Sequence, residues 1–143
     1  MRLSSTFVVA VTLLMAFATQ SHALDAETFV ASIAGQYHIT RVNGEKPKEN
    51  NSLADVYADA DEGALTMPYC LPGGLCDPGY LFLGYATTRI TQSMSHGVVR
   101  YDIYSEGDRY SWEDLGSGYR FTNYQYLLNG APIALIHELS KVR

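Results

Sequence analysis

Residues 98–141 read VVRYDIYS-EGD-RYSWEDL-GSG-YRFTNYQYLL-NG-APIALIHELSK, where hyphens separate segments rich in aromatic and β-branched residues from short turns. Segments of this composition favour strands, and Gly-containing turns of two or three residues favour hairpins. A parallel pair needs a crossover of about a dozen residues, which these turns cannot supply. The four segments are therefore predicted to form consecutive antiparallel strands.

The same pattern continues toward the N-terminus. Further predicted strands are Tyr37–Val42, Leu53–Ala58, Ala64–Pro68, Tyr80–Gly84 and Thr87–Ser93. Asp25–Ala34 predicts a short helix, because Asp25 can cap its first N–H groups and Gly35 can end it. A long meander protects its edges best by closing on itself. We therefore expect an all-β fold, an antiparallel up-and-down β-barrel of about eight strands with a short N-terminal helix.

The first 23 residues resemble a secretory signal peptide. Met1-Arg2 is followed by an apolar run to Phe17, and the segment ends Ser21-His22-Ala23. The apolar run is too short for a span of roughly 20 residues. We expect a leader at 1–23 and one barrel domain at 24–143, secreted to the extracellular space or to a periplasm, without a membrane span.

The charge balance excludes two classes of partner. The chain has 10 basic and 15 acidic residues, and loss of Arg2 with the leader leaves 9 basic residues, a net charge of −6. Nucleic acids and anionic membranes are bound by clusters of Lys and Arg. We expect neither as a partner.

Two modifications are expected if the protein is exported. Cys70 and Cys76 enclose Leu71-Pro72-Gly73-Gly74-Leu75, a tight loop that would let them form a disulfide in an oxidising compartment. Asn50-Asn51-Ser52 is a glycosylation sequon, which matters in a eukaryotic host.

The segment from Phe29, FVASIAGQYHI, resembles the opening motif of the lipocalin and calycin group. Gly35-Gln36-Tyr37 stands at the family's Gly-x-Trp, with Tyr in place of Trp, and Tyr101-Asp102-Ile103-Tyr104 loosely resembles its Thr-Asp-Tyr motif. The resemblance implies a barrel with a ligand cup, a carrier role and no catalysis.

Ser117-Gly118-Tyr119-Arg120-Phe121 is similar to the Ser-Gly-x-x-Tyr loop of small exported bacterial lysozyme inhibitors, with Phe121 in place of Tyr. This second resemblance implies a loop, led by Ser117, that enters the cleft of a target enzyme.

Aromatic side chains concentrate on the strands between Val98 and Leu128. Such side chains give large contact areas at low entropic cost, although cross-strand aromatic pairs also stabilise sheets. The residues predicted to bind a ligand or partner are Tyr104, Tyr110, Trp112, Ser117, Tyr119, Arg120 and Phe121.

Catalytic and metal chemistry have weaker signals. His38 and His137 would become neighbours if the first and last strands pair, but a metal site needs a third ligand. We therefore expect no metal and no cofactor. An enzyme of the cyclase or isomerase type on a small barrel stays an alternative, with Arg100, Asp102 and His38 as its first candidates.

The preferred function is a secreted, non-enzymatic, lipocalin-like binding protein that holds a small apolar or aromatic ligand. The alternative is a secreted inhibitor or effector that binds a target enzyme through residues 116–121.

Overall fold

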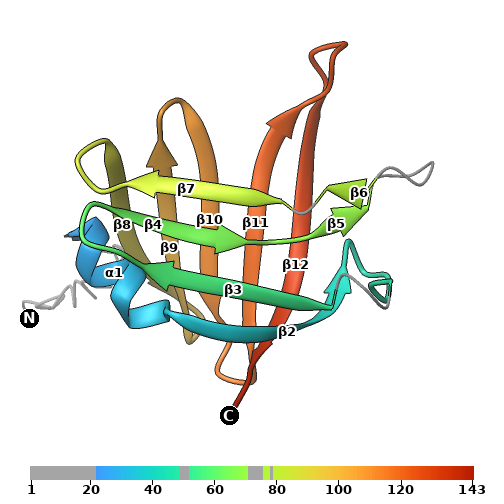
Figure 1. Ribbon diagram of the computed structural model, residues 1–143, viewed down its shortest axis with the longest axis horizontal. Coiled ribbons are helices and arrows are strands. Elements are labelled where there is room, and N and C mark those ends of the chain that lie inside the picture. Colours follow the sequence, from blue (N-terminus) through green and yellow to red (C-terminus); the bar gives the residue numbers. More distant parts are fainter. Residues whose placement is uncertain (1–21, 49–51, 71–75, 78) are drawn as a thin grey trace, which may run out of the picture.

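The computed structural model describes residues 22–48, 52–70, 76–77 and 79–143, and it is an all-β fold with one short helix (Figure 1). The helix is α1 (Ala26–Ile33). The strands are β1 (His22–Leu24), β2 (Gly35–Val42), β3 (Leu53–Ala58), β4 (Glu62–Thr66), β5 (Tyr69–Cys70), β6 (Cys76–Asp77), β7 (Tyr80–Gly84), β8 (Thr88–Ser95), β9 (Val98–Ser105), β10 (Asp108–Asp114), β11 (Tyr119–Tyr126) and β12 (Pro132–Lys141).

Ten strands form one antiparallel, strongly curled sheet in the order β1-β8-β9-β10-β11-β12-β2-β3-β4-β7. The short turns behave as their sequences predict. Glu106 and Gly107 both have positive φ (50° and 91°), as a type I′ hairpin requires. β12 pairs with β2, with Leu139 opposite Ile39, so the last strand meets the first strand after the helix. The antiparallel pairing of consecutive strands expected from the turns is confirmed from β8 to β12 and from β2 to β4.

The predicted closure of the barrel is wrong. β7 and β8 are consecutive in the chain, but no ladder joins them among the described residues, and the sheet is a half-barrel. The edge of β8 pairs instead with β1, with Ala23 opposite Thr91. α1 contacts β3, β4 and β8, so its side chains occupy interior space that a closed barrel would fill with its own strands. The helix thereby covers the part of the core that pairing between β7 and β8 would enclose in a closed barrel.

α1 forms where the sequence predicts it. Asp25 accepts a hydrogen bond from the Thr28 backbone N–H at 2.9 Å, which caps the helix. Phe29 and Val30 are fully buried, and the Phe29 ring lies 4.7 Å from that of Tyr101 on β9. Val30 packs against Gly63 of β4, where a Cβ atom would lie 2.8 Å from both Val30 methyl carbons. The absence of a side chain at Gly63 therefore sets how closely α1 approaches the sheet.

The interior at the α1 end of β2 is filled by aromatic rings. Tyr37 of β2 lies 5.3 Å from Trp112 of β10 and 5.6 Å from Tyr119 of β11. Trp112 in turn lies 6.4 Å from Phe121. Contacts of this edge and tilted geometry add to the free energy of burying the rings. The aromatic surplus seen in the sequence therefore serves in large part to fill the half-barrel.

Three sequence predictions fall wholly or partly outside the described residues. These are most of the leader (1–21), the sequon residue Asn50, and the side chains of Cys70 and Cys76. The backbone of β5 pairs Cys70 directly opposite Cys76 of β6, a register compatible with the predicted disulfide, which stays a prediction. The expected cleavage site after Ala23 falls within β1.

Replacing Gly63 with Ala should destabilise the fold by about 1–3 kcal/mol, because Val30 is stiff about χ1 and cannot move aside. Urea unfolding measures the loss. Combining G63A with Val30→Ala should recover most of it, since the shortened side chain makes room for the new methyl group. Additive losses in the double variant would contradict the contact.

Candidate functional site

The main candidate site is a cavity of about 260 Å³ between β7 and strands β10 to β12. Aromatic rings of Tyr110 and Phe121 form part of its wall. Polar side chains of Asp108, Asn123, Gln125 and His137 form another part. Small-molecule sites commonly combine an apolar lining with a few polar groups that orient the ligand. The cavity combines both kinds of group at the open side of the half-barrel.

His137 is the most unusual residue of this cavity. It lies on β12 opposite Phe121 of β11, its side chain is 1% exposed, and neither ring nitrogen has a hydrogen-bond partner among the described residues. Leaving a buried polar group unpaired costs free energy. A ligand that exchanged hydrogen bonds with the imidazole would recover that cost.

Burial also decides the charge of His137. Loss of solvent lowers the pKa of the imidazole below its ordinary value of 6.5. Polar contacts with the backbone of Pro68 and Leu135, which fall outside hydrogen-bond geometry, offset this only in part. The side chain is therefore neutral at pH 7 and offers one donor and one acceptor nitrogen.

Asp108 and Tyr110 are hydrogen-bonded to each other in the lining of the same cavity. The Tyr110 hydroxyl donates to Oδ2 of Asp108 at 3.3 Å. Burial, with the nearby Asp108 carboxylate, raises the pKa of Tyr110, so the phenol stays protonated. The carboxylate gives the cavity a negative charge, which disfavours anionic ligands.

The predicted binding residues do not form one surface. Tyr110, Trp112 and Phe121 are buried in the interior, and Tyr119 packs against Tyr37 there. Tyr104 is 46% exposed on the outer face. Only Tyr110 and Phe121 of the predicted set line the cavity.

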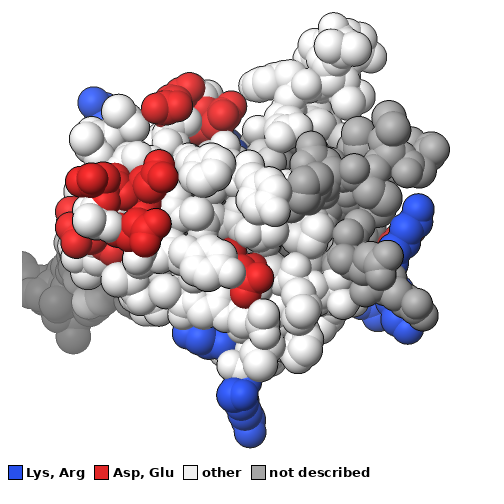
Figure 2. All heavy atoms as spheres, in the orientation of Figure 1, with Lys and Arg blue, Asp and Glu red and all other residues white. Residues whose placement is uncertain are grey.

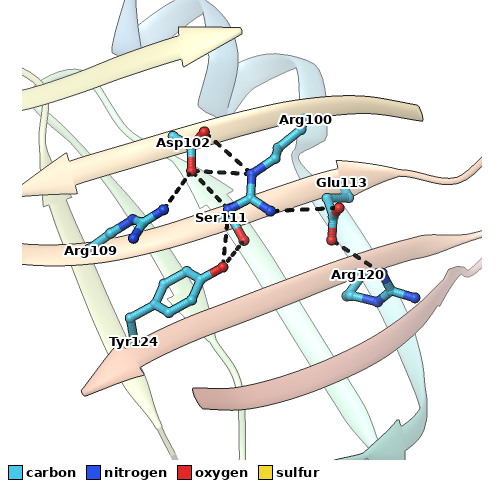
Figure 3. A network of polar contacts seen from close by, with 7 residues as sticks. All are labelled: Arg100, Asp102, Arg109, Ser111, Glu113, Arg120 and Tyr124. Atoms are coloured by element: carbon cyan, nitrogen blue, oxygen red, sulfur yellow. Dashed lines mark hydrogen bonds and ion pairs between the residues drawn. The ribbon is translucent and has the colours of Figure 1, made fainter. Parts of the chain in front are cut away.

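A second polar cluster covers the outer face of β9, β10 and β11 (Figure 3). Arg100 donates to Asp102 at 3.0 Å and to the Tyr124 hydroxyl at 3.0 Å. Arg109 approaches Asp102 at 3.5 Å. Glu113 lies 3.9 Å from Arg100 and 3.4 Å from Arg120. Each charge in this cluster has an opposite partner on its own or a neighbouring strand, as expected of a cluster that stabilises the sheet.

Tyr124 lies at the centre of that cluster. The guanidinium of Arg109 stacks on its ring, 4.6 Å from the centroid. Burial would raise the pKa of Tyr124, but hydrogen bonds to Ser111 and Arg100 and the charges of Arg100 and Arg109 outweigh it and lower the pKa. A hollow of about 720 Å³ lies beside this ring and Ile133 of β12. Because the charged side chains of this cluster already pair with one another, a ligand in the hollow would have to compete with these existing contacts.

The predicted inhibitor loop is a turn between β10 and β11. Ser117 is exposed, and the Gly116 N–H donates to Asp114 at 2.8 Å. A hollow of about 680 Å³ joins the turn to His38 and the C-terminal residues. Phe121, at the position of the family's Tyr, is fully buried, so this residue cannot enter the cleft of a target.

The three enzymatic candidates are split between two places. Arg100 and Asp102 are hydrogen-bonded to each other on the outer face. His38 lies on β2, opposite Ser140 of β12. His38 and His137 do not come together either, because His137 lies opposite Val42. In the described ranges, no three His, Cys, Asp or Glu side chains are grouped to hold a metal ion.

Comparisons with protein-family models, curated proteins and solved structures found no match to this chain. None of the helices in the described part is long and apolar enough to cross a membrane.

Sequence reasoning missed His137, Asp108, Asn123 and Gln125 as site residues. Alternation places Phe121, Asn123 and Gln125 on one face of their strand, so an inward Phe121 brings the two amides inward as well. Which face of that strand is inward depends on the curl of the whole sheet.

The variant His137→Leu should raise the stability of the ligand-free protein by about 1–2 kcal/mol, because it replaces an unpaired buried polar group with an apolar one. Thermal unfolding at pH 7 should show a melting temperature a few degrees higher. A lower melting temperature would mean that the imidazole has partners in the native state.

The same residue predicts a pH dependence. The unfolded state binds the His137 proton near pH 6.5 and the folded state binds it only at lower pH, so stability is lost as pH falls below 6.5. Between about pH 7.5 and pH 5.5 the melting temperature of the wild type should fall more steeply than that of H137L. If the melting temperatures of the two proteins fall in parallel with pH, His137 is not the source of the pH dependence.

Tyr124→Phe should cost about 1 kcal/mol, because it deletes the hydroxyl that Arg100 and Ser111 share. Tyr104→Phe is the matched control, since the Tyr104 hydroxyl makes no hydrogen bond among the described residues and the ring stays beside Arg109. Urea unfolding should separate the two variants. Equal losses would show that the hydroxyl network contributes nothing specific.

Proposed function

We propose that this protein is an exported, non-enzymatic binding protein that holds a small aromatic or apolar ligand in the cavity beside His137. The observation that carries the proposal is the imidazole itself, which lies 1% exposed on the cavity wall with both nitrogens unpaired among the described residues. Stability alone does not explain such a residue, because an apolar side chain would cost less. A bound ligand does explain it.

The lining indicates the kind of ligand. The rings of Tyr110 and Phe121 are stacked, with centroids 6.0 Å apart and planes 17° from parallel, and they offer flat apolar surface. His137 offers a neutral donor or acceptor, and Asp108 disfavours a negative charge. A cavity of about 260 Å³ lies below the roughly 300–1,000 Å³ of drug-sized sites. A compact, uncharged aromatic molecule with one polar group fits these conditions.

Two sequence features support this proposal. Gly35-Gln36-Tyr37 directly follows α1 at the start of β2, as the lipocalin resemblance implies, and a carrier role is what that resemblance suggests. The leader and the Cys70–Cys76 register favour an exported protein. The inhibitor alternative has less support, because Phe121 is buried and Arg120 pairs with Glu113.

Phenol is a suitable first probe, because it is a small ring with one hydroxyl. We expect phenol to shift the imidazole NMR signals of His137 and to bind about 5- to 100-fold more weakly to H137L, because a buried hydrogen bond is lost. Arg120→Ala is the control, since this residue lies on the outer face and outside the cavity lining. Binding that H137L leaves unchanged, or that R120A removes, would contradict the proposed site.

A further inference from the structure

β7 is an open edge of the sheet. Its only ladder partner among the described residues is β4. Just beyond the two ends of β7, the Met67 N–H donates to the Gly79 carbonyl and the Tyr85 N–H donates to the Asp61 carbonyl. Because bonded pairs alternate along an antiparallel ladder, Leu81 and Leu83 bond β4. The N–H and C=O groups of Tyr80 and Phe82 therefore point away from β4, toward the open edge.

This edge lacks the usual protection. Edge strands are commonly guarded by charged residues, prolines or bulges, whereas β7 reads Tyr-Leu-Phe-Leu-Gly. Tyr80 and Phe82 are 67% and 61% exposed. Tyr57 of β3 is 56% exposed and lies in the same cross-strand row as Phe82, with only Ala64 between them. The outer face beside the open edge is therefore aromatic and solvent-exposed.

The same region is acidic. Between Lys48 and Arg89 the sequence contains six acidic residues and no Lys or Arg. Asp55 and Glu62 share cross-strand rows with Tyr80 and Gly84 of β7, and Asp59 and Asp61 lie in the adjoining turn. Figure 2 shows acidic side chains gathered beside the uncharged centre of this face. The face is therefore complementary to a basic partner.

We propose that the edge of β7 binds a basic, extended peptide segment, which adds to the sheet as a further antiparallel or parallel strand. Its backbone would take up the outward N–H and C=O groups of Tyr80 and Phe82. Its Lys or Arg side chains would lie over the exposed rings and near the carboxylates, where cation–π and ionic attraction act together. A second copy of this chain fits less well, because it would bring two acidic edges together.

The test uses fluorescein-labelled acetyl-KVKTKVK-amide and measures its anisotropy on titration with the protein at low salt. The variant Phe82→Pro removes an N–H that β4 does not use, which edge strands tolerate. We expect F82P to weaken binding by about tenfold or more, and Phe82→Ala, which keeps the N–H, to weaken it less. Tyr104→Phe, which lies on the outer face of β9 and outside the lining of the cavity beside β7, should bind the peptide like the wild type.

Two changes to the peptide keep the test independent of how well F82P folds. The N-methylated peptide, which cannot donate along its backbone, and the peptide with Glu for Lys should both bind about tenfold more weakly or not at all. The proposal is overturned if the unmodified peptide does not bind at millimolar protein, or if either modified peptide binds equally well. It is also overturned if sedimentation shows a wild-type dimer that F82P dissociates, because the edge would then pair with itself.

Discussion

The packing of Tyr37 is the contact on which the rest of the structure depends. Its ring meets Trp112 and Tyr119, its hydroxyl donates to the Ile33 carbonyl at the end of α1, and Lys141 of β12 lies over it. One side chain thereby joins the helix, the first strand after it and the last strands of the chain. Burial raises its pKa to about 12, with a smaller effect of Tyr119, so the phenol remains neutral at this junction. These contacts hold β10, β11, β12 and β2 in a tight curl at the middle of the sheet, while α1 contacts β8 toward one end of the sheet and β3 and β4 toward the other.

The missing ladder between β7 and β8 links the two proposals. A closed barrel would use the outward groups of β7 for pairing and would leave less room beside β10 to β12. Within the described part of the chain, the open form instead retains a cavity with an unpaired imidazole and a strand edge whose outward backbone groups pair with no further strand. Both features cost stability, and the aromatic core and α1 offset that cost. Proteins often keep such locally unfavourable groups where they bind other molecules.

Local signals in the sequence predicted most of the fold, and the failures are non-local. The turn at Asn43-Gly44 has the positive φ angles that its residues favour. At Glu106-Gly107 only Gly107 favours that conformation, and Glu106 adopts it as well. The Asp25 cap forms as expected. The strand predicted to run to Leu128 ends at Tyr126, because residues 127–130 form a turn in which the Gly130 N–H donates to the Leu127 carbonyl. The alternation of side chains along a strand places Tyr110 and Trp112 on one face, and likewise Tyr119 and Phe121, but it does not indicate which face points to the interior. His137 lies opposite Phe121, so its place in the cavity lining follows only from knowing that Phe121 faces the interior.

Trp112 gives the protein an internal optical reporter. It is the only tryptophan of the chain, it is almost fully buried, and rings of Tyr37 and Tyr119 lie 5.3 and 5.5 Å away. Light absorbed by these tyrosines is therefore passed to the indole, whose emission comes from an apolar, rigid setting. Unfolding removes both the transfer and the shielding at once. The packing of β2 against β10 and β11 is thus visible in the intrinsic fluorescence of the unmodified chain.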